Sequence, residues 1–171
     1  IPERTPLHNW QISPHRHDSF FQIFCLSAGS GEITGKAERM PLSAPCAIFV
    51  PPGDVHGFSY SRDVDGLVVT ALGDRLRSLA AADRQVAAFA ATTRVVPLHE
   101  GDADATFAID CVHRLHTELS SRATGRLLLL EPLMTGALVA LVRASSAAVD
   151  DTPDNHDHRR IETLTTLVAA H

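Results

Sequence analysis

The residue pattern changes near Gly73, and this change constrains the possible folds more than any other feature of the chain. Before Gly73, short runs rich in Phe, Ile and Val alternate with turns marked by Gly, Pro and Asp. After it, apolar residues recur with the helical period. Closely spaced strands of this kind are typical of a β-sandwich or a small barrel. The first part predicts strands over residues 9–12, 20–27, 32–38, 47–50, 57–60 and 67–71.

The second part of the chain predicts mainly helices. Residues 74–82 are expected to form a short helix and residues 92–97 one more strand. Two long amphipathic helices are predicted over residues 102–121 and 124–144. Pro132 either kinks the second of these helices or opens its main segment at the first turn.

The end of the chain predicts a connection to a further region. A polar linker at 150–155 precedes a predicted tail helix at 160–170, whose pattern reaches His171 without a helix stop signal. Because the chain also starts without Met, we expect it to be part of a longer protein. The expected plan is a barrel over residues 1–97, a helical layer of the same domain over 98–149, and a linker with a tail helix over 150–171.

Charge and composition argue against two classes of function for this chain on its own. The net charge is −5, and Lys and Arg form no cluster of the kind that nucleic-acid-binding modules use to neutralise phosphates. No apolar run approaches the roughly 20 residues of a membrane span, since the run at 137–142 ends at Arg143. The three cysteines lie in apolar segments, which indicates reduced core residues of a cytoplasmic protein.

Three histidines form the strongest chemical signal. His15 and His17 are two residues apart, so on an extended chain they project to the same side. His56 follows a turn that contains Pro51 and Gly53. Three imidazoles with one oxygen donor are a typical site for a divalent transition metal such as Zn, Ni or Fe. The alternative is that these side chains line a pocket and hydrogen-bond an organic ligand directly.

These motifs resemble those of the cupin superfamily. Its first motif is a His-x-His pair followed after four residues by Glu, and its second places a Pro-x-Gly turn before a further His. His15, His17 and His56 match the histidine positions, while Gln22 stands where a metal-binding cupin has Glu. The resemblance implies a small double-stranded β-helix, or jelly-roll-like, barrel with a metal held by these four residues. The neutral amide of Gln22 implies weaker metal binding, because one compensating charge is missing.

Aromatic residues stand where they could line a ligand pocket inside such a barrel. By strand alternation, Phe58 and Tyr60 share the face of His56, and two further Phe share the face of Gln22. An apolar cavity with a few converging polar groups is what a small-molecule site requires. The same residues are equally expected in a plain barrel core. Together with two arginines that could bind an anionic ligand, the predicted ligand-binding residues are Trp10, Arg16, Phe20, Phe24, Phe58, Tyr60 and Arg62.

A narrower resemblance covers almost the whole chain. Residues 8–17 with Gln22, and residues 44–58, resemble the effector-sensing domains of AraC/XylS-type transcription regulators, most closely the activators of aromatic-acid catabolism. The resemblance implies a non-catalytic bacterial protein of the cytoplasm whose barrel binds a small-molecule effector, an aromatic acid. It further implies that trailing helices form a homodimer, and that DNA is bound only through a helix-turn-helix domain outside this sequence.

Two other functions are compatible with the same residues. The histidines would also serve a metal-dependent cupin enzyme, such as a dioxygenase or an isomerase. This function would not explain the helical half. A cupin enzyme would also be expected to have Glu at position 22 in place of Gln22. A purely structural dimerising domain with an empty pocket is the other alternative. The sensor accounts for the barrel and the helices together.

The two long helices carry more apolar surface than a small barrel can cover. One stripe is expected to pack on the barrel, which leaves the remainder for a partner, and a second copy of the chain is the commonest partner. We therefore expect a homodimer through the helical layer, with Val112 and Leu119 among the residues that face away from the barrel.

Overall fold

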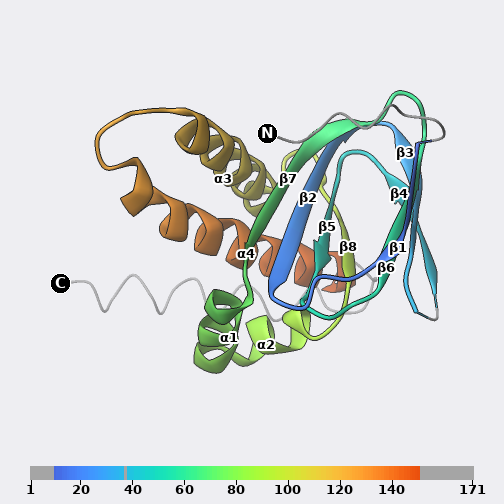
Figure 1. Ribbon diagram of the computed structural model, residues 1–171, viewed down its shortest axis with the longest axis horizontal. Helices are drawn as coiled ribbons and strands as arrows, with labels where there is room; N and C mark the ends of the chain where they lie inside the picture. Colours follow the sequence, from blue (N-terminus) through green and yellow to red (C-terminus); the bar gives the residue numbers. More distant parts are fainter. Residues whose placement is uncertain (1–9, 37, 151–171) are drawn as a thin grey trace.

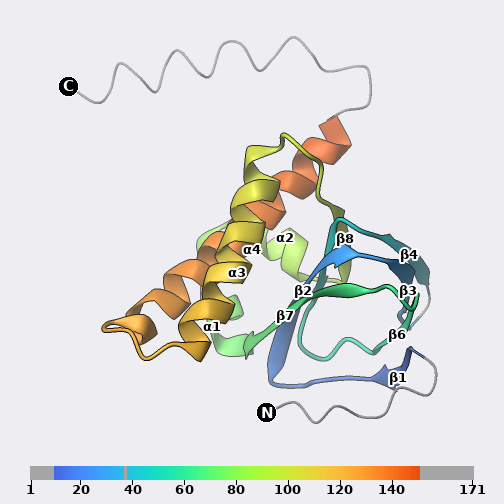
Figure 2. The same ribbon diagram turned by 90° about the horizontal axis from the view of Figure 1, so that it is seen from above.

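The computed structural model describes residues 10–36 and 38–150, with side chains up to residue 147. The predicted tail helix at 160–170, most of the predicted linker and the residues ahead of Trp10 lie outside the described residues. Within the described part, the chain forms a β-barrel of two facing sheets with a helical layer on one side (Figures 1 and 2). This arrangement confirms the predicted class of a small, β-rich barrel followed by a helical part.

Eight strands in the described part form two antiparallel sheets. The sheets have the strand orders β1-β6-β3-β4 and β7-β2-β5-β8. Figure 2 shows the second sheet between the first sheet and the helices. The strands are β1 (Gln11–His15), β2 (Phe20–Ala28), β3 (Ser30–Thr34), β4 (Arg39–Ser43), β5 (Cys46–Val50), β6 (His56–Tyr60), β7 (Asp65–Leu72) and β8 (Arg94–Pro97).

Strand β5 explains how the molecule acquires two separate cores. All five of its residues are buried, because one face points into the barrel and the other points toward the helices. Ile48 packs in the barrel interior, in a cluster with Ile33 and Phe58 from the opposite sheet. Phe49, one residue further, packs in the core that the sheet shares with the helices. The continuous apolar run at 46–50 is therefore a strand covered on both faces.

The helical layer consists of four helices in the described part. They are α1 (Gly73–Ala82), α2 (Arg84–Ala90), α3 (Ala103–Ser120) and α4 (Arg126–Asp150). The long helices α3 and α4 pack against each other beside the sheet (Figure 2). The side chains of Ala108, Leu138 and Leu141 are fully buried in the core between these helices and the sheet. The amphipathic pattern of α3 and α4 thus results in one shared core.

Several elements differ from the sequence expectations. The strand predicted over 32–38 ends at Thr34, the last residue of β3, which pairs with Arg39 at the start of β4, a strand that was not predicted. Helix α2 was not predicted. Helix α4 runs from Arg126 through Pro132 without ending there, so the proline does not open the main segment. Val112 does not face away from the core: it is 1% exposed, because it packs in the core that the helices share with the sheet.

One helix of the described part, α4, is long and apolar enough to cross a membrane by length and composition alone. Within Arg126–Ala147, an 18-residue window has a mean hydropathy of 1.8. The expectation that no segment approaches such a span was therefore too strict. The fold explains the composition without a membrane, because Ala137, Leu138 and Leu141 are buried in the core of the domain.

The three cysteines are free thiols, as expected from their apolar surroundings. Cys46 and Cys111 are buried, and Cys25 is half-buried on β2. Burial raises the pKa of the Cys25 thiol to about 11. A thiol with such a pKa stays protonated near neutral pH and is a poor nucleophile or metal ligand.

Candidate metal and ligand site

The three predicted metal-binding histidines come together at one end of the barrel. His15 ends β1, His17 lies in the turn between β1 and β2, and His56 begins β6. Strands β1 and β6 are neighbours, and their register pairs His15 with His56. One possible ligand atom of each histidine lies within 4.8 Å of those of the other two. Three imidazoles in this arrangement suit a single divalent transition metal.

Backbone carbonyls fix the tautomers of two of these histidines. Nδ1 of His15 lies 2.9 Å from the carbonyl oxygen of Ser13, and Nδ1 of His56 lies 2.9 Å from that of Asp54. Because a carbonyl oxygen only accepts hydrogen bonds, Nδ1 carries the proton and donates in both cases. Nε2 is then the unprotonated nitrogen of each ring. This is the arrangement that metal-binding histidines commonly show.

Two buried polar atoms in this region have no hydrogen-bond partner among the described residues. They are Nε2 of His56 and Oε1 of Gln22. A buried acceptor without a partner costs roughly 1–3 kcal/mol. Both atoms are lone-pair donors, so a metal ion or a ligand with hydrogen-bond donors would satisfy them. The donor set present therefore fits a divalent metal.

His56 lies in an environment that favours its neutral form. Its side chain is 1% exposed. Burial, followed by the effect of the neighbouring His15 and His17, lowers its pKa below the ordinary value, although the Asp54 carbonyl acts in the opposite direction. A neutral imidazole is the form that binds a metal.

The loop before His56 is held in place by contacts that the sequence motifs did not indicate. Gly53 has a φ of 81°, a conformation that favours glycine, and its N–H donates to the carbonyl of His17 at 2.9 Å. The carboxylate of Asp54 accepts hydrogen bonds from the backbone N–H and the hydroxyl of Thr93, at 3.1 and 2.7 Å. These contacts join the two histidine-bearing segments to each other and to the start of β8.

Gln22 is placed by strand register at the same end of the barrel. It pairs with Val50 of β5 and with Thr70 of β7. Gln22 lies two residues before Phe24 on β2, so the two side chains share a face, and Phe24 packs in the barrel interior. The amide Nε2 of Gln22 donates to the hydroxyl of Thr70 at 3.2 Å. Thr70 was not among the predicted site residues.

The aromatic residues of the interior form a contiguous group beside His56. The ring centroids of Phe58 and His56 are 5.8 Å apart, and those of Phe58 and Phe24 are 4.8 Å apart. Tyr60 stacks on Phe58 at 5.1 Å, and burial raises the pKa of its hydroxyl. Phe20, at the start of β2, is 41% exposed. The interior thus offers an apolar, aromatic lining next to the histidine cluster.

Comparison with known proteins assigns the chain to a family. Residues 2–137 match the AraC-like ligand binding domain. The chain belongs to this family. No curated protein shows significant sequence similarity to it. Among solved structures, it is similar to HEPD from Streptomyces albus, which was determined with its substrate 2-hydroxyethylphosphonate and Fe(II) bound. That similarity has 17% identity and a TM-score of 0.27, and it covers 78% of this chain but 35% of the HEPD chain.

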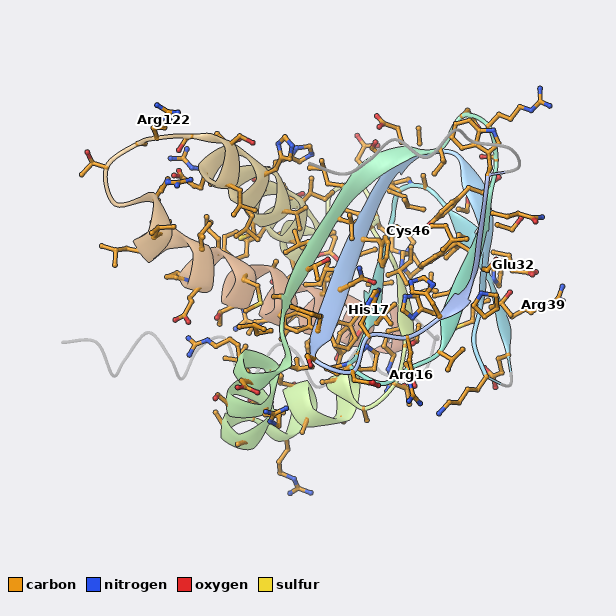
Figure 3. The ribbon with its side chains drawn as sticks, in the orientation of Figure 1. Arg16, His17, Glu32, Arg39, Cys46 and Arg122 are labelled. Atoms are coloured by element: carbon orange, nitrogen blue, oxygen red, sulfur yellow. The ribbon has the colours of Figure 1, made fainter. Side chains whose placement is uncertain are left out.

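The two arginines predicted to bind an anion lie away from the histidine cluster of this AraC-like domain. Arg16 forms an ion pair with Asp18 at 3.1 Å, and both side chains are largely exposed. Figure 3 shows Arg16 toward the surface and His17 toward the barrel. Arg62 is exposed in the turn that follows β6, whereas His56 begins that strand. Trp10 is half-buried ahead of β1, and its carbonyl accepts from the N–H of Tyr60 at 2.7 Å.

An apolar groove of about 440 Å³ lies outside the barrel of the AraC-like domain. It is formed by β7, α1 and the two long helices. Leu115 and Met134 are buried along it, whereas Leu72 and Leu119 are exposed. Arg75 of α1 and Glu131 of α4 form an ion pair at 3.5 Å beside it. The helical layer thus presents apolar surface that the barrel does not cover.

Proposed function

We propose that this AraC-like ligand-binding domain is the effector-sensing part of a bacterial AraC/XylS-type transcription regulator. A small molecule, an aromatic acid, binds at the histidine end of the barrel in the cytoplasm. Its binding controls DNA binding by a helix-turn-helix domain elsewhere in the full protein. The observation that carries the proposal is the histidine cluster of His15, His17 and His56, which lies beside an aromatic interior in a domain of this family.

A divalent transition metal, Zn, Ni or Fe, is the cofactor that this donor set suits best. His15, His17 and His56 would hold it through nitrogen, and Gln22 through its amide oxygen. The two buried atoms without partners, on His56 and Gln22, support this proposal. The metal would supply a Lewis-acidic positive charge that binds an oxygen of the effector.

A thermal-shift screen tests effector binding directly. The domain is prepared with zinc and after treatment with a chelator, and each form is screened against benzoate and its hydroxylated derivatives. A ligand at 100 times its Kd stabilises the folded state by about 2.7 kcal/mol. We expect one or more acids to raise the Tm of the zinc-loaded domain. His116→Ala, which changes an exposed histidine on α3, is the control and should leave the shift unchanged. No shift with any acid in either form would contradict the proposal.

The helical layer is proposed to form a homodimer. At the loop between α3 and α4, Leu119, Leu127 and Leu128 are exposed, and the side chain of Leu128 is 80% exposed. Apolar side chains gathered in this way are typical of a protein interface. Pairing of two domains would match the two half-sites that a dimeric DNA-binding regulator contacts.

A metal-dependent cupin enzyme, either a dioxygenase or an isomerase, is the alternative function. The same histidine cluster supports it, because three protein ligands leave further coordination positions for a substrate. Oxygen consumption and product analysis with the Fe(II)-loaded domain and each stabilising acid distinguish the two functions. Turnover of an acid would favour the enzyme, whereas its recovery unchanged would favour the sensor.

A further inference from the structure

Gln22 has a defined orientation at the proposed metal site. Its Nε2 donates to the hydroxyl of Thr70 at 3.2 Å, across the β2–β7 pair. This contact uses the nitrogen end of the amide. The oxygen end, Oε1, is buried and has no partner within the described part of the chain. The hydroxyl of Thr70 thus turns the amide so that its acceptor oxygen remains available for a ligand.

The charges around this site leave a bound divalent ion without a direct counter-charge from the four proposed ligands. Neutral imidazoles and the amide of Gln22 contribute no formal charge. The carboxylate of Asp54, which is close enough to influence His56, is directed at Thr93. The carboxylate of Asp18 pairs with Arg16 at the surface. Glu in place of Gln22 would instead bring one negative charge to the ion.

We infer that Gln22, positioned by Thr70, makes this a site for a ligand with an anionic oxygen. That oxygen completes the coordination of the metal, and its negative charge compensates the charge of the ion. The inference rests on the proposed metal site and adds the residues, Gln22 and Thr70, that make the site select an anionic ligand. A carboxylate or phenolate group would bind, whereas the corresponding neutral amide would not. Since Arg16 and Arg62 are both exposed to solvent, the anion is attracted by the metal rather than by the guanidinium group of an arginine.

The test compares wild type with Gln22→Glu, using Co(II) as the metal because its visible spectrum reports changes in its ligands. Co(II) affinity is measured by competition with a chelator. Azide, a small anion that requires no shaped pocket, and benzoate are then titrated into the loaded protein, with benzamide as the neutral control. We expect Gln22→Glu to bind Co(II) about tenfold or more tightly than wild type. The same variant should bind azide and benzoate about tenfold or more weakly, and benzamide should not change either spectrum.

A second pair of variants tests the positioning role of Thr70. Thr70→Val removes the hydroxyl that holds Gln22 but keeps the shape of the side chain, and it should weaken Co(II) binding about 10- to 100-fold. Thr70→Ser retains the hydroxyl and should restore affinity near that of wild type. These variants also keep the inference testable should Gln22→Glu fail to fold, as checked by circular dichroism.

The outcomes separate this inference from the proposed function. Wild type that takes up no Co(II) would contradict the proposed metal site itself. Wild type that takes up Co(II) but binds neither azide nor benzoate would overturn the anion-binding inference and leave the metal site standing. Equal anion affinity in wild type and Gln22→Glu, or equal Co(II) affinity in Thr70→Val and Thr70→Ser, would also overturn it.

Discussion

Among single residues, His56 is placed by the fold in an environment that disfavours its protonated form. Its ring is buried between the aromatic interior and two further histidines, and its Nδ1–H donates a hydrogen bond to the Asp54 carbonyl. Protonation of its other nitrogen would place a charge in a desolvated position next to two imidazoles. The burial that prepares His56 to bind a ligand therefore also makes its protonated form unfavourable.

This environment predicts a pH dependence of stability in the metal-free protein. Burial lowers the pKa of His56 from its ordinary value of 6.5 in the folded state. As the pH falls through 6.5, the unfolded chain binds a proton at this position while the folded protein does not. The free energy of unfolding should therefore decrease as the pH is lowered from 6.5 toward the folded-state pKa of His56. Urea denaturation at a series of pH values, with a chelator present, measures this effect.

The variant His56→Gln provides the control for the pH prediction. It removes the titrating group, so the part of the pH dependence that His56 causes should disappear from its unfolding curves. Identical pH dependence of wild type and variant below pH 6.5 would show that His56 is not the responsible residue.

The sequence revealed the histidines but not the residues that hold them. His15, His17 and His56 were identifiable because a short spacing and a Pro-Gly turn mark them locally. Thr70 and Thr93 were not, because they reach the site only through strand pairing and loop packing over long sequence separations. A threonine in a strand pattern gives no sign of which distant residue it will contact.

At the scale of elements, long periodic segments were predicted well and short ones were not. Helices α3 and α4 follow from an apolar period sustained over many residues. Helix α2 has seven residues, too few for a clear period, and β4 contains a proline that weakens a strand pattern. A local signal for α2 was nevertheless present in Asp83, which is a favourable helix N-cap residue.

The cap of α2 provides a stability prediction. The carboxylate of Asp83 accepts hydrogen bonds from the backbone N–H groups of Gln85 and Val86, at 2.7 and 3.0 Å. Asp83→Ala should lower the free energy of unfolding by about 1 kcal/mol, because it leaves these donors without that acceptor. Asp83→Asn keeps an acceptor oxygen and should lose much less. Equal losses in the two variants, measured by urea denaturation, would argue against a capping role.

For the whole molecule, the sheet β7-β2-β5-β8 separates the barrel interior from the helical layer, two regions with different proposed functions. One face encloses the aromatic interior and the histidine cluster, and the other supports the helical layer (Figure 2). Strand β7 contributes Thr70 to the hydrogen bond with Gln22, and it also lines the groove beside α3 and α4. Strand β7 therefore lies next to both the proposed effector site and the groove that borders the proposed dimer surface at Leu119.

The exposed leucines at the loop between α3 and α4 predict how the dimer is disrupted. Leu128→Glu places a charge on a side chain that is 80% exposed, so the monomer should fold normally while self-association is weakened. Light scattering over a dilution series should give the dimer mass for wild type and the monomer mass of 18.4 kDa for the variant.

Val68→Glu is the matched control, because Val68 is also an exposed apolar residue but lies on the edge strand β7. It should leave the dimer intact. Dissociation by Val68→Glu but not by Leu128→Glu would place the interface at the sheet edge. If the wild type has the monomer mass at tens of micromolar, this result would contradict the proposed homodimer.

The metal content of the purified domain tests the central claim most directly. Elemental analysis is applied to wild type, to the double variant His17→Ala with His56→Ala, and to the control His116→Ala after exposure to zinc and removal of the excess. Wild type and the control should each retain about one ion per chain, and the double variant essentially none. Equal metal content in wild type and the double variant, or none in wild type, would contradict a metal site formed by these histidines.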